Sequence, residues 1–423
     1  MFSTLSWTGV RNTYLLLTLL QTLAASFIWG INTLFLLDAG LNNLEAFGAN
    51  AAFTAGMMIF EIPTGVVADT RGRRLSFVLG AGTLFASTLL YLFMWQIHAG
   101  FLAWAIVSAL LGLGFTFFSG ATEAWLVDAL DATGFEGDLE SVFAKGQIVS
   151  GIAMLSGSVA GGYIAQATNL GVPYILRGAV LFLTMVMALL LMRDIGFQPE
   201  RSRGYRSEVK TILSASVKHG WGNPPVRWLM LAAPFTGGVG IYVFYAAQPY
   251  LLELYGDPEA FGIAGLAAAI VAGAQVLGGM VVPYLRRIFK RRSTILVTGA
   301  ILSAVFIALL GLVSTLVAAI AIMVVWGIMF SAVFPVRQAY INGVIPSKQR
   351  ATVLSFDSLM SSAGGVVVQP ALGRSADLWG YGTSYLVAAA IEALAIPFVI
   401  GAKRSNAASD PIGSLPPEEV EPV

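Results

Sequence analysis

The sequence contains no cysteine and only two histidines, His98 and His219, among its 423 residues. Without cysteine the chain can form no disulfide, no thiolate metal site and no thiol nucleophile. We therefore expect no metal and no cofactor. The sequence also has no P-loop and no G-x-S-x-G motif, which removes P-loop ATP hydrolysis and nucleophile-elbow chemistry. A net charge of +1 gives no electrostatic reason to expect nucleic acid as a partner.

Charge is equally scarce. Only 11% of the residues are Asp, Glu, Lys or Arg, against roughly 25% in soluble domains. Hydrophobic residues make up 57% of the chain, and the mean hydropathy is +0.78. About twelve apolar runs approach the roughly 20 residues that a helix needs to cross a bilayer. We predict an all-α integral membrane protein with 12 transmembrane helices, near residues 12–37, 45–68, 75–97, 101–127, 142–167, 173–193, 227–254, 260–284, 294–312, 315–341, 351–372 and 382–402.

The basic residues predict the orientation, because cytoplasmic loops carry an excess of Lys and Arg. If the N-terminus is inside, the even-numbered connections hold most of them, including the "RRIFKRR" cluster at 286–292. Of the remainder, Arg177 and Arg374 fall near the outer face, where acids such as Asp257 and Glu259 collect. We expect both termini to be cytoplasmic and the protein to lie in the plasma (inner) membrane.

One long basic connection divides the spans into six plus six. We interpret residues 196–226 as a cytoplasmic linker, with a short interfacial helix as one option, between two six-helix bundles at 1–195 and 227–402. The loop "GVVADTRGRR" in the first half is echoed by "GGMVVPYLRRIFKRR" in the second. Such internal pseudo-symmetry is typical of transporters that bind substrate near the midplane. Residues 403–423 have no periodicity and are expected to form a disordered cytoplasmic tail.

The loop at residues 65–74 resembles motif A of the major facilitator superfamily, G-x-L-A-D-x-x-G-R-R/K, between the second and third helices. Val67 replaces the usual leucine. The resemblance implies a latch that closes the two halves on the cytoplasmic side, with Asp128 as the partner of one arginine and with glycines that allow a tight turn and close helix approach. Alternatively, the arginines only obey the positive-inside rule. The matching positions are Gly65, Ala68, Asp69, Gly72, Arg73 and Arg74.

Two further segments bear on the type of transporter. "GSVAGG" is similar to motif C, G-P-x-x-G-G, which marks antiporters of this superfamily; Ser158 replaces its proline, and the glycines are Gly157, Gly161 and Gly162. Small residues in this helix also permit close packing, which is the structural interpretation. The R-x-x-Q-G-x-G motif of the drug/proton antiporters is altered, because Ser108 and Leu111 replace its arginine and glutamine.

Acids inside predicted spans are candidates for proton handling, because ionisable groups are costly in a bilayer. Glu61 precedes Asp69 by eight residues and should lie roughly 12 Å deeper. It either carries a proton or hydrogen-bonds a carbonyl freed by Pro63. Glu123 either handles protons or a cationic substrate, or is a buried hydrogen-bond partner.

In the second half, Arg337 and Asp357 are candidates for a pair in the cytoplasmic half of the cavity or at the inner gate. Several other residues in the spans either line the cavity or join helices through hydrogen bonds or packing. The cavity candidates are Asn32, Gln248, Gln275 and Tyr245.

These patterns favour a secondary active transporter that works by alternating access, and not an enzyme. The first hypothesis is proton-coupled efflux of small, fairly hydrophobic molecules, with a small-molecule substrate, protons and the lipid bilayer as partners and a monomeric chain. The alternatives are an uptake symporter or uniporter for a small metabolite and, more remotely, a membrane-embedded enzyme or a receptor on a transporter scaffold.

Overall fold

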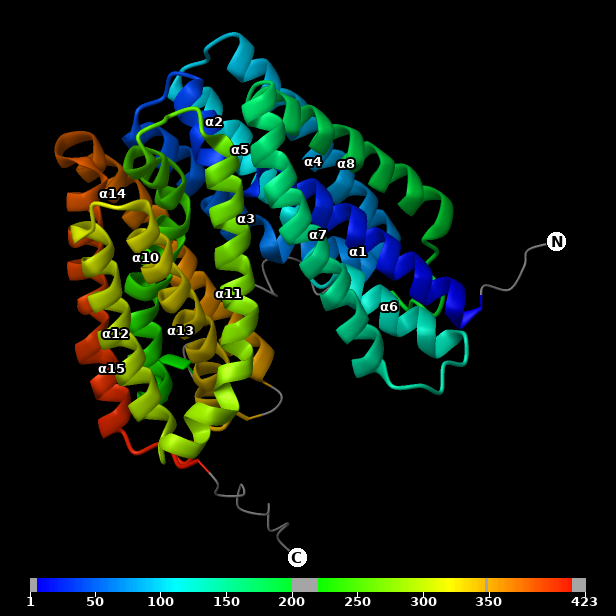
Figure 1. The fold of residues 1–423 in the computed structure, drawn as a ribbon. Coiled ribbons are helices and arrows are strands. Elements are labelled where there is room, and N and C mark those ends of the chain that lie inside the picture. Colours follow the sequence, from blue (N-terminus) through cyan, green and yellow to red (C-terminus); the bar gives the residue numbers. More distant parts are fainter. Residues whose placement is uncertain (1–5, 200–219, 347–348, 413–423) are drawn as a thin grey trace, which may run out of the picture. The chain divides into compact units, whose positions relative to one another are not determined.

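The computed structural model describes residues 6–199, 220–346 and 349–412, and the side chains of residues 351 and 352 are not described. Throughout these residues the regular secondary structure is helical, apart from one isolated bridge between Arg291 and Pro411 (Figure 1). Most of the predicted linker (200–219) and the end of the predicted tail (413–423) lie outside the described residues.

Eleven helical segments of the described chain are long and apolar enough to cross a membrane. They confirm the predicted all-α membrane architecture, in which helices satisfy every backbone polar group internally. The helices are α1 (Trp7–Trp29), α2 (Asn32–Asp38), α3 (Asn43–Arg71), α4 (Arg73–Gln96), α5 (Phe101–Thr116), α6 (Ala121–Ala132), α7 (Leu139–Ala167), α8 (Gly171–Leu191), α10 (Pro224–Tyr255), α11 (Phe261–Ile288), α12 (Arg292–Leu312), α13 (Leu316–Asn342), α14 (Arg350–Ala393) and α15 (Ala395–Arg404).

Polar residues fix where several helices begin. Ser6 accepts a hydrogen bond from the backbone N–H of Gly9 and caps α1. Asn42 and Glu45 form a reciprocal capping box at the start of α3, and Asp138 caps α7. Each cap pairs a backbone N–H that the first turn of a helix leaves without a partner.

Two predicted spans are broken in the structure. The span expected at 12–37 is interrupted at Gly30 and Ile31, where Ile31 leaves helical geometry (φ −132°, ψ 2°). The span expected at 101–127 is divided into α5 and α6, and Gly120 adopts φ +68° at the second helix start. Conversely, α14 runs through the loop expected at 373–381, and only Gly380 (φ +79°) separates the last two spans.

The described chain forms two compact units. The first comprises residues 1–208 together with 244–270, and the second comprises 209–243 together with 271–423. The boundary therefore passes through α10 and α11, whose adjoining ends belong to the first unit.

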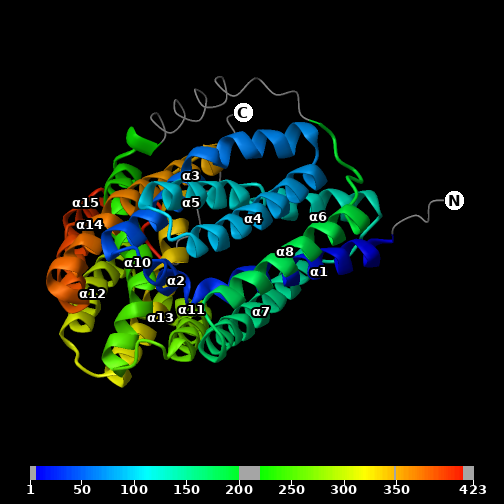
Figure 2. The ribbon, with the colours of Figure 1, turned by 90° about the horizontal axis from the view of Figure 1, so that it is seen from above.

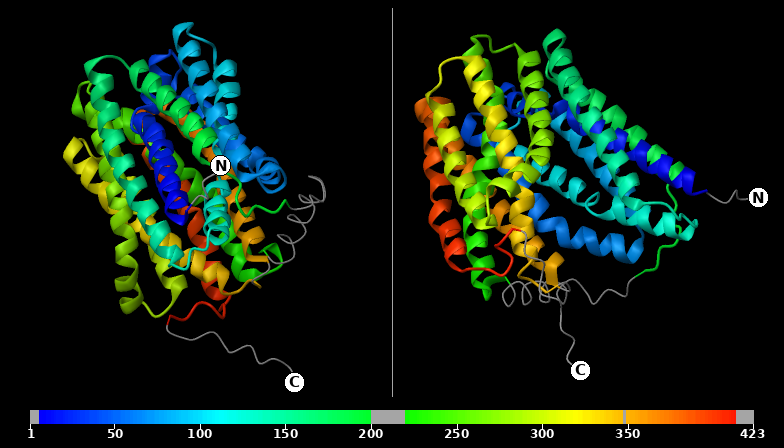
Figure 3. Two further views of the ribbon diagram at one scale, coloured as in Figure 1. Left: turned by 90° about the vertical axis from the view of Figure 1, so that its right-hand side faces the viewer. Right: turned by 60° about the horizontal axis from the view of Figure 1, so that its bottom comes forward.

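Within the first unit, α3 packs along α5, α1 along α7, and α4 along α8 (Figure 2). Its core contains a cluster of aromatic rings in which Phe35 stacks on Tyr174 with ring centroids 4.0 Å apart. Tyr91 and Trp104 complete this cluster. In the second unit, α12 packs against α13, α14 and α15 (Figure 3).

Candidate functional site

The motif A loop is a tight turn between α3 and α4. Gly72 adopts φ +109°, a conformation that side-chain-bearing residues rarely adopt. Asp194, which follows α8, accepts a hydrogen bond from the backbone N–H of Arg74 at 2.8 Å. A Cβ atom on Gly72 would also lie 2.3 Å from an Asp194 carboxylate oxygen, so a larger residue would strain the turn and displace the Asp194 side chain. Gly65 differs, because a Cβ there would meet nothing within 4 Å, and the expected close helix approach is not found.

Arg73 and Arg74 of this loop have partners close by, although the Nε atom of each is buried without a hydrogen-bond partner among the described residues. Asp69 pairs with Arg73 across the turn, and the Arg73 guanidinium lies 5.8 Å from the centre of the Phe197 ring. The Arg74 guanidinium donates to the backbone carbonyl of Leu189 at 2.6 Å. In the described residues Asp128 forms no ion pair with either arginine, so the expected pairing is wrong in this structure. The end of α8 and the segment after it provide these partners instead.

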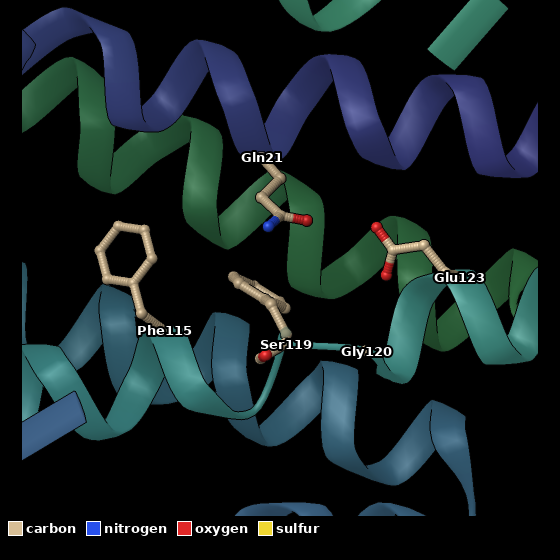
Figure 4. Close-up of a pocket in the computed structure, with 6 residues that line it drawn as sticks. Gln21, Phe115, Ser119, Gly120 and Glu123 are labelled. Carbon is tan, nitrogen blue, oxygen red and sulfur yellow. The ribbon is translucent and has the colours of Figure 1, made fainter. Parts of the chain in front are cut away.

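A pocket of about 460 Å³ opens where α5 and α6 are separated. Its wall combines aromatic rings with a hydroxyl, an amide and a carboxylate. In Figure 4, Phe115 lies at one end of the pocket, Glu123 lies at the other, and Gln21 reaches in from α1 between them. The lining residues are Gln21, Phe115, Phe118, Ser119, Gly120 and Glu123.

Ser119 lies near both predicted proton-handling acids but contacts only Glu61. Its hydroxyl donates to a carboxylate oxygen of Glu61 at 2.8 Å, and the same residue lines the pocket beside Glu123. Both acids are exposed, and neither forms an ion pair within the described part of the chain. Thr64 is the residue whose hydroxyl bonds the carbonyls of Phe60 and Glu61 near Pro63.

The break between α1 and α2 is held open by Gln248 of α10. In an unbroken helix the N–H of Thr33 would bond the carbonyl of Trp29, four residues earlier. Here Thr33 donates to the Gln248 Oε1 at 2.8 Å, and the Gln248 Nε2 donates to the carbonyl of Trp29 at 3.1 Å. The side-chain amide is thus inserted into the hydrogen-bond ladder of the helix, which is a known cause of a kink.

The remaining cavity candidates lie in different environments. Asn32 donates to Asn50 at 2.9 Å and accepts from the Tyr174 hydroxyl at 2.9 Å, so its amide is engaged in a buried network. The Gln275 side chain is exposed, and its backbone carbonyl accepts from Ser331. Tyr245 is half-buried beside the ring of Phe244. Neither these three candidates nor Gln248 lines the pocket of the first unit.

The glycines of the motif C segment form a close packing seam. A Cβ on Gly161 would lie 1.9 Å from the carbonyl oxygen of Phe27, and one on Gly157 would lie 1.8 Å from the Ser26 hydroxyl. A Cβ on Gly162 would approach the backbone of Phe261 at 2.6 Å. Helix α7 therefore meets α1 and the start of α11 backbone to backbone.

In the second unit, Arg337 of α13 and Asp357 of α14 form a two-pronged ion pair. One of the two hydrogen bonds is very short, and the other joins the Arg337 Nη2 to an Asp357 carboxylate oxygen at 2.7 Å. The same Nη2 also donates to the carbonyl of Leu229 at 3.1 Å. This geometry ties α13, α14 and α10 together.

Sequence reasoning missed two buried charged residues inside the apolar spans, besides Asp410 in the predicted tail, whose carboxylate accepts from the Ser293 N–H and hydroxyl. Arg177 of α8 was assigned only to the outer face, yet its side chain is among the largest fully buried ones in the described chain. Glu392 of α14 is 3% exposed and hydrogen-bonds the Ser303 side chain. Each is a single charge inside an apolar run, which is the signal that could have identified it.

Comparisons with known proteins agree with this architecture. The sequence matches the profile of the Major Facilitator Superfamily over residues 14–286 and 238–417. No curated protein sequence matches it. Among solved structures, the nucleoside transporter NupG is similar with a TM-score of 0.75 and 13% identity, covering 94% of this chain and 98% of that one.

Two other solved structures resemble the chain at similar distance. The D-xylose–proton symporter gives a TM-score of 0.67 at 18% identity, covering 93% of this chain and 97% of its own. A bacterial homologue of the human lysosomal transporter Spinster gives 0.68 at 15% identity, with 94% and 97% covered. At these identities the likeness shows the fold, and the profile match over nearly the whole length shows the family. The chain belongs to the Major Facilitator Superfamily and is an integral membrane transporter.

Proposed function

We propose that this transporter works by alternating access and exports small, fairly hydrophobic molecules in exchange for protons. The observation that carries the proposal is the pocket at the α5–α6 break, whose wall includes Glu123 and Ser119, and Ser119 in turn donates a hydrogen bond to Glu61. A carboxylate without a permanent cation is available to exchange protons or to bind a cationic group. The rings of Phe115 and Phe118 supply the apolar part of the same wall.

The motif A loop supports a gating role on the cytoplasmic side. Its positively charged end is held in place by Asp69, Asp194 and the end of α8, so Arg73 and Arg74 are positioned before any partner arrives. A fixed loop of this kind can open and close as one piece when the halves rock. We propose that it acts as the inner latch, with both termini cytoplasmic and with bundles at 1–195 and 227–402 as the moving parts.

Uptake by proton symport or by uniport is the second candidate. At the positions where drug/proton antiporters carry an arginine and a glutamine, this chain has Ser108 and Leu111. Ser108 is fully buried and hydrogen-bonds the Tyr91 hydroxyl at 2.6 Å, so it has a structural partner rather than a coupling charge. The similar solved structures include a D-xylose–proton symporter and a nucleoside transporter, which leaves a metabolite as the alternative substrate.

Proteoliposomes with a pH-sensitive dye in the lumen test the first candidate. Under an imposed pH gradient, hydrophobic candidate substrates should elicit proton flux through the wild-type protein. Glu61→Gln and Glu123→Gln should each reduce that flux by roughly a hundredfold, the lower end of the range that a proton-transfer group typically contributes. Glu136→Gln, which alters an exposed loop acid, is the matched control and should leave the flux unchanged.

Two results would reject proton-coupled export. One is the absence of substrate-elicited proton flux. The other is proton flux that is unchanged in both Glu61→Gln and Glu123→Gln. Proton flux that runs with the substrate instead of against it would favour the uptake symporter.

A further inference from the structure

Arg177 occupies the interior of the first unit. The residue is 2% exposed and contacts three other helices. Its Nε donates to the Thr88 hydroxyl of α4 at 3.1 Å, and one terminal nitrogen donates to the carbonyl of Ala24 in α1 at 3.2 Å. The guanidinium also lies 5.9 Å from the centre of the Phe115 ring of α5.

No acid neutralises this arginine among the residues that the structure describes. Its recorded polar contacts are a hydroxyl and a backbone carbonyl, and its Nη2 is buried with no hydrogen-bond partner. A guanidinium has five N–H donors in a fixed fork, and a buried charge without a counter-charge is strongly unfavourable. The two arginines with acidic partners, Arg73 and Arg337, show that the chain does supply carboxylates elsewhere.

Arg177 contacts a residue that lines the pocket. Phe115 is the shared residue, because its ring contacts the guanidinium and also lines the pocket. On α1, the carbonyl of Ala24 that binds Arg177 lies three residues from Gln21, another lining residue. Figure 4 shows Phe115 at the end of the pocket opposite Glu123. The same aromatic ring thus contacts both the pocket and an unneutralised cation.

We propose that Arg177 is a binding residue for an anionic group of the transported molecule, and that the substrates are small aromatic or apolar carboxylates. Rotation of the Phe115 ring exposes the guanidinium to the pocket, and a carboxylate then accepts two hydrogen bonds from its fork. The apolar body of the ligand packs on Phe115 and Phe118. This inference rests on the proposed transport function and names the substrate class of the same pocket.

A purely structural role does not account for the positive charge. The second unit has a residue in the corresponding place: Glu392 lies 215 positions after Arg177, and it hydrogen-bonds Ser303, which lies 215 positions after the Arg177 partner Thr88. Both residues link to a hydroxyl on the third span of their half, with opposite charges. A polar side chain of either charge can therefore make this contact with the third span. The contact alone does not explain why the first half carries a guanidinium.

Equilibrium binding to the purified full-length protein tests the proposal without any ion gradient. The probes are benzoate, salicylate and naphthoate, each offered together with its neutral amide at neutral pH, and the retained compounds are measured by mass spectrometry. The wild type should retain at least one carboxylate about tenfold over its amide, as expected for a charge-assisted, two-pronged contact. Arg177→Met should abolish this preference.

The matched control is Arg227→Met. Arg227 also lies over an aromatic ring, that of Trp228 at 5.8 Å, but belongs to the second unit, and its replacement should leave the preference intact. Thermal unfolding of Arg177→Met should match or exceed that of the wild type, because an apolar side chain of similar volume replaces an unneutralised buried charge.

Two outcomes would overturn the inference. Either the wild type prefers no carboxylate over its amide, or the preference survives in Arg177→Met. If Arg177→Met does not fold, Arg177→Lys decides, since it keeps the charge and the stem. It should show a weaker preference for the carboxylate than the wild type, and an undiminished preference would reject the proposal. A protein that binds carboxylates but moves no protons would instead reject the proton coupling alone.

Discussion

Arginine side chains in this protein occupy three distinct electrostatic settings. Arg73 pairs with an acid four residues away across a turn, Arg337 pairs with Asp357 on a neighbouring helix, and Arg177 has no acidic partner in the described chain. The first two charges are compensated within their own unit and serve to fix the backbone around them. The third is compensated only when an anion arrives, which makes it the most informative of the three for function.

The Asp69–Arg73 pair leads to a prediction at the residue scale. Asp69→Asn removes the charge but keeps the shape and hydrogen-bonding ability of the side chain, so membrane insertion and expression should be unchanged. The Arg73 guanidinium loses its counter-charge and no longer holds the loop in one geometry. We expect substrate transport in proteoliposomes to fall to background.

Asp131→Asn, a change at an exposed acid at the end of α6, serves as the control and should retain transport. Transport by Asp69→Asn at the wild-type rate would contradict the latch.

Individual residues were predictable from the sequence only in part. The motif pattern located Asp69 and the acids Glu61 and Glu123, because residue type and spacing carry that information. It did not locate the true partners of Arg74, which are the carbonyl of Leu189 and the carboxylate of Asp194. Those contacts join segments about 115 residues apart, and nothing in the local pattern encodes such a distance.

At the scale of elements, α7 packs closely against its neighbours because its glycines have no side chain. Its glycines allow the backbone of α1 to approach so closely that a single methyl group has no room at Gly161. Small residues are a general means of packing helices in membranes, where no hydrophobic force drives their association. The seam therefore has a structural function whether or not the transporter is an antiporter.

This packing predicts different effects for the same substitution at two places on one helix. Gly161→Ala inserts a Cβ at 1.9 Å from the Phe27 carbonyl oxygen, so α1 must move. We expect the free energy of unfolding to fall by about 2 kcal/mol, within the usual cost of overpacking. Gly151→Ala, on the same helix, meets nothing within 4 Å and should be neutral or slightly stabilising, because alanine favours a helix.

Thermal or denaturant unfolding of the two purified variants compares these effects directly. Equal stability of Gly161→Ala and Gly151→Ala would show that α7 and α1 are not in close contact.

The positions of the helices were predictable, but their interruptions were not. Apolar runs determine where a span lies, and eleven segments of the described chain satisfy that criterion. The break after Trp29 depends on Gln248, a residue on α10 that replaces one hydrogen bond of the ladder by two of its own. Gly30, Asn32 and Thr33 at the break are poor helix formers within an apolar run, but nothing in that local sequence identifies Gln248 as the partner.

At the scale of the whole molecule, both units consist of long apolar helices, but they differ in the charged residues that they bury. The first contains an unneutralised buried arginine and a pocket with an acid, whereas the second contains a buried ion pair and a buried acid. The repeat of six spans was visible in the sequence through its loops. The adjoining ends of α10 and α11 belong to the first unit defined by contacts, a feature that only the fold reveals.

The distribution of basic residues predicts the orientation of the molecule in the membrane, and the absence of cysteine makes that prediction easy to test. A single introduced cysteine is the only thiol in the chain. Glu259→Cys lies in the exposed connection between α10 and α11, and Lys290→Cys lies in the exposed basic connection between α11 and α12. The positive-inside rule places the first outside and the second in the cytoplasm.

A membrane-impermeant maleimide should therefore label Glu259→Cys in intact cells and label Lys290→Cys only after the membrane is opened. The cysteine-free parent controls for background labelling. The reverse pattern would invert the whole topology, because consecutive connections lie on opposite sides of the bilayer. Inversion would place the motif A loop outside the cell, where it could not act as a cytoplasmic latch, so the result also constrains the proposed gating mechanism.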